Sequence, residues 1–153
     1  RAGIVGMVRT WALEMKRAGV TINAIIPEAA TDMTKTVPYF QKAVEADERG
    51  EAMPAFFRET LGFGTPQDVA GLVAFLSSDE AANISGQATG AGGDRMQVWK
   101  HPEPAVTEFN PGGWTYEALQ ERGKNIIEDN LQSVGVVFPE LPAELQPQIP
   151  VKA

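Results

Sequence analysis

The residues best placed to do chemistry form the stretch PEAATDMT, residues 27–34 of this 153-residue chain. The stretch directly follows an apolar, β-branched segment of the kind that forms strands buried on both faces. In open α/β sheets, ligands bind just beyond the carboxyl ends of such strands. The Thr31 hydroxyl can hydrogen-bond an amide or a phosphate, and Met33 offers a flexible apolar contact. From these residues alone, a ligand-binding turn and an ordinary exit from a strand are equally open.

Other motifs are weaker candidates. The glycines of GAGGDR, residues 90–95, do not match G-x-G-x-x-G, and no apolar helix follows them. We therefore interpret this motif as a structural turn after a strand rather than a phosphate loop. His101 is the only histidine and precedes a proline, which favours a loop or interface residue over a catalytic one. Trp11, Trp99 and Trp114 are interpreted as packing residues.

Composition argues against several classes of protein. The formal net charge is −7, and the isoelectric point is near 4.7, which disfavours a nucleic-acid surface because such surfaces need clustered Lys and Arg. The chain has no cysteine, and a single histidine makes a metal site unexpected. No apolar run approaches the roughly 20 residues of a membrane span. We expect a cytoplasmic protein whose partners include neither nucleic acid nor membrane.

The elements that position residues 27–34 can be predicted from local patterns. Residues 1–18 are predicted to form a helix that ends at Gly19, with an apolar face of Ile4, Val8, Trp11, Ala12 and Met15. A buried strand is predicted at residues 20–26, closed by Pro27. Residues 28–64 are predicted to be a long excursion with one or two short helices, which is typical of a lid or binding segment.

The elements that follow residue 64 can be predicted in the same way. Thr65 as N-cap, Pro66 and Asp68 predict a helix over residues 65–76, with a buried stripe of Val69, Leu72, Val73 and Leu76. A last strand is predicted at residues 87–91. The chain is expected to be irregular from Gly92 onward, apart from a helix from Tyr116 to about Gln132 that is interrupted at Gly123. The proline-rich end is expected to be an extended arm on this or another subunit.

In order and spacing, residues 1–94 resemble the C-terminal half of a short-chain dehydrogenase/reductase. The segments that carry this resemblance are RAGIVGMVRTWALEMKRAGVTINAIIP, PEAATDMT, TPQDVAGLVAFLSSDEAANISGQ and ATGAGGD. The resemblance implies an α/β fold, namely the C-terminal part of a doubly wound, parallel-sheet Rossmann-like domain. Residues 95–153 would then be an irregular C-terminal extension ending in the proline-rich arm.

A narrower resemblance concerns the pattern P-x-A-A-T-x-M-T and the extension at residues 92–115. Both look like the branch that contains the 3-hydroxyacyl-CoA dehydrogenase domains of multifunctional β-oxidation enzymes. This chain departs from most of the family at Glu28, where a glycine usually follows the proline.

The resemblance implies an oxidoreductase that interconverts a secondary alcohol and a ketone with NAD or NADP, with a 3-hydroxyacyl thioester as the candidate substrate. The nicotinamide end of the cofactor would rest on Pro27, Glu28, Ala29, Thr31 and Met33. Residues 35–63 would form a substrate lid, in which apolar substrate contact and simple packing are equally open for Phe40, Met53, Phe56 and Phe57.

By the same resemblance, Arg1 falls on the family's catalytic Lys, and the family's Tyr would lie four residues upstream. The family's Gly-rich loop and catalytic Ser also have no counterpart among these residues, so we expect the chain to be part of a longer polypeptide, with a divergent or two-chain protein as the alternative. Arg at that position keeps the charge but not the shape of Lys. A non-catalytic subunit that partners an active homologue is the competing function. The family also implies a homodimer or homotetramer, or assembly with a chain that carries the N-terminal half.

Overall fold

The computed structural model describes residues 2–133, 135 and 137–147. The chain divides into two compact units: the first combines residues 1–100 with 141–153, and the second comprises residues 101–140.

The first unit begins with the predicted helix. Helix α1 spans Ala2–Met15 and continues as a 3-10 turn, η1, over Lys16–Ala18. The chain then reverses at Gly19, which adopts a left-handed φ of 68° and donates its amide to the Lys16 carbonyl. The glycine stop predicted from the sequence is confirmed.

Strand β1 spans Ala24–Pro27, so the prediction that the strand starts at Val20 is wrong. Before Ala24 the chain is held by hydrogen bonds to residues 84–87, most of which involve a side chain. The Ile22 amide donates to the Ser85 hydroxyl at 3.1 Å, and the Asn23 side chain donates to the Ile84 carbonyl at 2.8 Å. These contacts attach the segment to the turn before the next strand, and regular pairing begins only afterwards.

The sheet has three strands in the order β1-β2-β3. Strand β2 (Ala88–Gly92) runs parallel to β1, close to the predicted position, and strand β3 (Arg95–Trp99) returns antiparallel to β2. The expectation that residues 95–99 are irregular is wrong. Gly93 and Asp94 form a two-residue turn between the paired ends of β2 and β3, which makes GAGGDR a hairpin.

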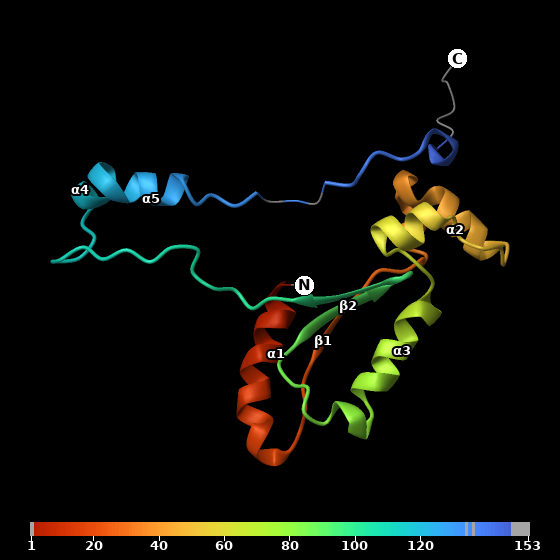
Figure 1. Ribbon diagram of the computed structural model, residues 1–153, viewed down its shortest axis with the longest axis horizontal. Coiled ribbons are helices and arrows are strands. Elements are labelled where there is room, and N and C mark those ends of the chain that lie inside the picture. The colour runs from red at the N-terminus through yellow and green to blue at the C-terminus, as the bar shows by residue number, and fades with distance from the viewer. Residues whose placement is uncertain (1, 134, 136, 148–153) are drawn as a thin grey trace. The chain divides into compact units, whose positions relative to one another are not determined.

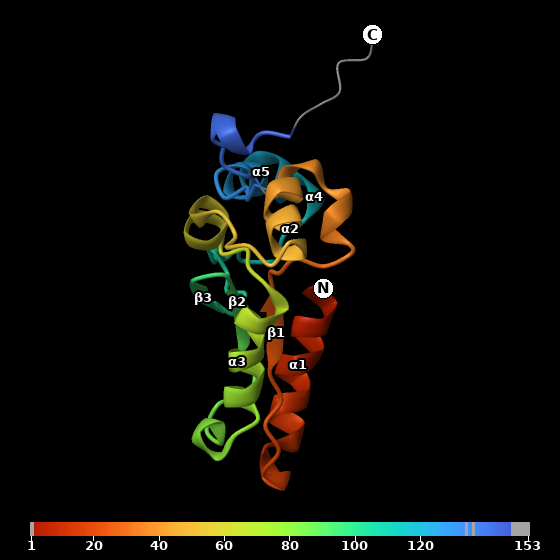
Figure 2. The ribbon, with the colours of Figure 1, turned by 90° about the vertical axis from the view of Figure 1, so that its right-hand side faces the viewer.

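Helices cover both faces of this sheet, as Figures 1 and 2 show for α1 and α3 (Pro66–Leu76). Under α1, Val8 packs against Ala24 and Ala88, with Val5, Ile22 and Ile26 beside them. Helix α3 begins with the predicted capping box, in which Thr65 and Asp68 bond reciprocally to each other's backbone amides. The α/β, doubly wound character predicted from the sequence is confirmed.

The predicted apolar faces of these helices are only partly buried. On α1, Val8 and Ala12 are buried, whereas Ile4 is 56% and Trp11 46% exposed. On α3, Val69 is buried and Val73 is 46% exposed. A three-stranded sheet is narrow, so it covers one strip of each helix and leaves the rest of the apolar face in solvent.

The segment between β1 and α3 carries its own core. It contains the 3-10 turns η2 (Thr34–Thr36) and η3 (Pro38–Phe40), helix α2 (Gln41–Glu48) and a π-helical turn, η4 (Phe56–Leu61). Buried residues form one apolar cluster here, which we call the lid core. The cluster consists of Ala30, Ala43, Val44, Met53, Phe57, Leu61, Phe63 and Leu141. Because Leu141 belongs to this cluster, the start of the proline-rich arm packs on its own chain, near the 3-10 turn η7 (Ala143–Leu145).

The second unit contains the predicted helix in three parts: α4 (Tyr116–Ala118), the π-helical η6 (Leu119–Gly123) and α5 (Lys124–Glu128). The helix ends four residues before the predicted Gln132, and the irregularity at Gly123 is a π-helical segment. The Arg122 guanidinium lies 5.0 Å from the centre of the Trp114 ring and donates to the Phe109 carbonyl. Within the described residues, no helix combines the length and apolar character needed to span a bilayer.

Burial of Phe57 yields the first prediction. Its side chain has no exposed surface, so Phe57→Ala is expected to lower the free energy of unfolding by about 3–5 kcal/mol through lost transfer energy and a cavity. Phe109→Ala is the matched control, because Phe109 is 82% exposed, and should change stability by less than about 0.5 kcal/mol. Urea unfolding of the full-length gene product measures both, and equal effects would show that the lid core is placed wrongly.

Candidate functional site

The candidate site lies at the carboxyl end of β1, where the chain leaves the sheet between two other segments. The Glu28 amide donates to the Ala91 carbonyl at 3.1 Å, and the Glu28 carbonyl accepts from the Gly64 amide at 3.3 Å. The Ala30 amide then donates to the Gly64 carbonyl at 2.7 Å. The exit from β1 is therefore held on one side by β2 and on the other by the residues that precede α3.

The structure brings the predicted nicotinamide-side residues together on this one loop. Pro27, Thr31 and Met33 are exposed, Met33 by 75%, and Glu28 and Ala29 are half-buried. The loop is closed locally by Thr34, whose hydroxyl accepts from the Thr31 amide and donates to the Thr31 carbonyl, both at 2.7 Å. The Thr34 side chain thus stabilises the loop, and the Thr31 side chain remains at the surface.

A hollow of about 150 Å³ lies between this loop and α2. It is lined by Ala30, Thr31, Asp32, Lys35, Val44, Asp47 and Glu48. Lys35 pairs with Glu48 at 2.5 Å and with Asp32 at 2.9 Å, and these hydrogen bonds, Glu48 first, raise the pKa of the ammonium group above its ordinary value. The carboxylates still outnumber Lys35, so the hollow disfavours an anion and suits a neutral or cationic group.

The turn after β2 carries two ion-pair connections. In the first, the Arg58 guanidinium on η4 binds Asp68 through two hydrogen bonds of 3.0 and 3.1 Å and binds Asp94 at 2.7 Å. In the second, Arg95 donates to Glu28 at 2.6 Å. Asp68 and Arg58 shift each other's pKa: the bidentate bond from Arg58, followed by bonds from Thr65, lowers the pKa of Asp68, and the two carboxylates raise that of Arg58.

Sequence reasoning noted Glu28 as a departure from the family and Asp68 as a helix cap, but it assigned no role to Arg58, Asp94 or Arg95. Their partners lie 10 to 67 residues away in the sequence, so local spacing could not reveal them. The available signal was an adjacent acid and base, Asp94 and Arg95, directly after two glycines.

The predicted lid contacts divide into two pairs. Phe57 and Met53 are buried in the lid core, so packing, the second of the two interpretations, describes them in this structure. Phe40 stacks on Phe63 with ring centres 4.4 Å apart, and Phe56 meets Phe57 edge to face at 5.8 Å. Both are only partly buried, so each keeps some surface for a ligand.

The remaining sequence candidates are not part of this loop. Arg1, at the family's Lys position, is outside the described residues. His101 is exposed at the start of the second unit. Trp11 and Trp99 are 46% and 49% exposed, so the packing interpretation is wrong for much of their surface. Among the described residues, no group of three or more His, Asp or Glu side chains is arranged to hold a metal ion.

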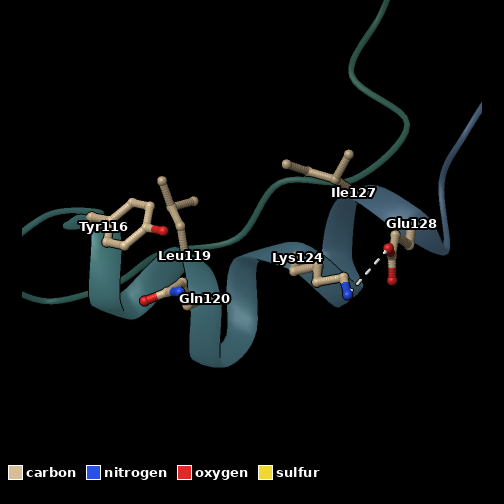
Figure 3. Close-up of a pocket in the computed structure, with 6 residues that line it drawn as sticks. All are labelled: Tyr116, Leu119, Gln120, Lys124, Ile127 and Glu128. Atoms are coloured by element: carbon tan, nitrogen blue, oxygen red, sulfur yellow. Dashed lines mark ion pairs between the residues drawn. The ribbon is translucent and has the colours of Figure 1, made fainter.

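A larger hollow, of about 420 Å³, lies on the helix of the second unit (Figure 3). It is an open surface lined by Tyr116, Leu119, Gln120, Lys124, Ile127 and Glu128. The Lys124–Glu128 ion pair, at 3.6 Å, lies along one helix and does not converge with groups from other elements. Because none of the predicted site residues line this hollow, it is not the candidate site.

Comparison with known proteins identifies relatives of the first 93 residues. Residues 1–93 match the family model described as enoyl-(acyl carrier protein) reductase. A 3-oxoacyl-(acyl-carrier-protein) reductase, FabG, of Thermotoga maritima is 38% identical over 95 residues, which are 61% of this chain and 35% of that protein. The human (3R)-3-hydroxyacyl-CoA dehydrogenase is 40% identical over 88 residues, 56% of this chain and 30% of that protein. The chain thus spans about a third of the length of these relatives.

The fold has a solved counterpart. A short chain dehydrogenase from Mycobacterium avium aligns with a TM-score of 0.60 at 24% identity, and the alignment covers 88% of this chain and 37% of that one. At this identity the comparison establishes the fold alone.

The lowered pKa of Asp68 predicts a pH dependence. A carboxyl group whose pKa is lower in the folded state stabilises the protein above its unfolded pKa, near 3.8, and this stabilisation is lost as pH falls through the folded value. Asp68→Asn is expected to lower the free energy of unfolding at neutral pH by about 1–3 kcal/mol, with the difference from wild type narrowing below about pH 4. Urea unfolding of the full-length gene product across this pH range measures it. Glu59→Gln removes an exposed charge on η4 and should show the same unfolding free energy as the wild type at each pH. If the loss of stability in Asp68→Asn does not depend on pH, the ion pair is contradicted.

Proposed function

Because the chain belongs to the short-chain dehydrogenase/reductase family, we propose that it supplies the nicotinamide-side wall and the substrate lid of an NAD(P)-dependent oxidoreductase. The reaction interconverts a secondary alcohol and a ketone. The substrate class is a 3-hydroxyacyl or 3-oxoacyl thioester, in keeping with the relatives that are named for acyl-carrier-protein and acyl-CoA substrates.

The observation that carries this proposal is the loop at the carboxyl end of β1. It presents Thr31 and Met33 to solvent beside a hollow whose carboxylates outnumber its single Lys. A nicotinamide ring is neutral when reduced and cationic when oxidised, so this electrostatic environment suits the ring and not the phosphates of a dinucleotide. The residues therefore fit the nicotinamide end of the cofactor.

The residues of the wall then have two tasks. Pro27, Ala29 and Met33 provide apolar contact for a planar ring, and the Thr31 hydroxyl hydrogen-bonds a polar substituent and fixes the rotation of the ring. The bound NAD(P) supplies the hydride chemistry, and the protein's part is to orient and desolvate the reacting atoms. Partly buried Phe40 and Phe56 on the lid offer apolar surface to an acyl chain.

The deciding experiment uses the full-length gene product. Oxidation of NADH and NADPH is followed with acetoacetyl-CoA as the substrate, and nucleotide binding is measured by calorimetry. Turnover with either nucleotide supports the proposal. If no ketone is turned over and no nucleotide binds, the non-catalytic subunit becomes the better description.

Thr31→Val tests the wall directly. Loss of one hydrogen bond worth about 1.4 kcal/mol should raise the KM for the cofactor about tenfold. Thr60→Val makes the same change at an exposed position on η4 and should leave the cofactor KM unchanged. Steady-state kinetics with varied NAD(P)H measures both variants, and equal cofactor KM values would remove Thr31 from the cofactor wall.

A further inference from the structure

The turn between β2 and β3 connects two parts of the proposed site that the sheet alone would leave independent. It comprises Gly92–Arg95, the motif whose glycines do not form a phosphate loop. Consecutive residues of opposite charge on this turn point to different segments: Asp94 pairs with Arg58 on the lid, and Arg95 pairs with Glu28 on the cofactor wall. We infer that this turn is a positioning element. Arg95 positions the cofactor wall, and Asp94 positions residues 56–64, which we call the lid base. The inference deepens the proposed function and rests on it.

Backbone packing at the turn shows that these contacts are built closely. A Cβ on Gly92 would overlap the carbonyl oxygens of both Glu28 and Gly62, so only glycine lets β2 approach the wall and the end of the lid together. The Asp94 amide also donates to the Arg58 carbonyl at 3.2 Å. Asp94 and Arg58 are therefore joined through backbone and side chain, which fixes their separation as well as their charge pairing.

Arg95 reaches both segments with one side chain. Its guanidinium donates to Glu28 at 2.6 Å, and its stem and Nε lie against Gly62, where a Cβ would overlap them. Gly62 ends η4 with a φ of 64°. The Arg95 side chain thus lies between Gly62, which follows η4, and Glu28, the first residue after β1.

Arg58 completes the connection to α3. Its guanidinium bridges Asp94 and Asp68, and Asp68 is the third residue of α3 and part of its capping box. The neighbouring Phe57 anchors the same turn in the lid core. A displacement of the turn at Asp94 must therefore be transmitted to the lid base, whereas a displacement at Arg95 is transmitted first to Glu28.

Because Asp94 and Arg95 contact different segments, substitutions at the two residues should change different KM values. In the active full-length gene product, Arg95→Met should raise the KM for NAD(P)H about tenfold with a smaller change in the KM for acetoacetyl-CoA. Asp94→Asn should raise the KM for acetoacetyl-CoA about tenfold with a smaller change in the cofactor KM. Arg95→Lys keeps the charge pair with Glu28 and should restore the cofactor KM to within about threefold of wild type.

Arg49→Met is the matched control, because Arg49 is exposed and forms an ion pair with Glu51, another exposed residue of the same segment. It should change neither KM value, since exposed ion pairs contribute little. If Arg95→Met and Asp94→Asn shift both KM values in parallel, or no more than Arg49→Met does, the turn is an ordinary structural hairpin and the inference is wrong.

Hydrogen exchange separates failure of this inference from failure of the proposed function. In the same protein without substrate, Arg95→Met should accelerate amide exchange at residues 28–35, and Asp94→Asn should accelerate it at residues 56–64. Unchanged exchange at both segments overturns the inference whether or not the protein is active. Absence of turnover and of nucleotide binding in the wild type overturns the proposed function alone.

Discussion

The structure of the candidate site depends on the close approach of three backbone segments at the carboxyl edge of the sheet. Glu28 lies between Ala91 of β2 and Gly64 before α3, and it is hydrogen-bonded to both. This approach is possible because Gly92 has no Cβ to collide with the carbonyls of Glu28 and Gly62. The path of the chain after Glu28, and with it the exposure of Thr31 and Met33, follows from this constraint.

Apolar packing does not by itself join the lid to the sheet. The lid core around Phe57 and the cluster of Val8, Ala24 and Ala88 under α1 are separate. Hydrophobic contact is non-directional and tolerates sliding, whereas a bidentate guanidinium–carboxylate pair has a fixed geometry. The polar connections through Arg58 and Arg95 therefore define the position of the lid base, and the apolar clusters supply stability on either side.

Prediction from the sequence was most successful where the signal was local. The stop at Gly19 and the capping box of Thr65 and Asp68 were predicted from neighbouring residues and are present in the structure. The predicted start of β1 was wrong because the residues before Ala24 hydrogen-bond to Ser85 and Ile84, which are distant in sequence. Residues 27–34 were proposed as a site because they follow a predicted buried strand, and the nicotinamide role came from the family resemblance. How far these residues are buried could not be predicted, because it depends on contacts with Gly64 and β2.

Strand β3 was the largest omission, and it changes how Glu28 is understood. From the sequence, Glu28 was an anomaly, because a carboxylate replaced the usual glycine at the edge of a cofactor site. A half-buried carboxylate loses part of its hydration and needs a partner. The hairpin supplies Arg95 as that partner, and the pair can form only when β3 folds back on β2. Glu28 thus pairs with a residue of β3, which lies outside residues 1–94, and this pair ties the loop after β1 to the third strand.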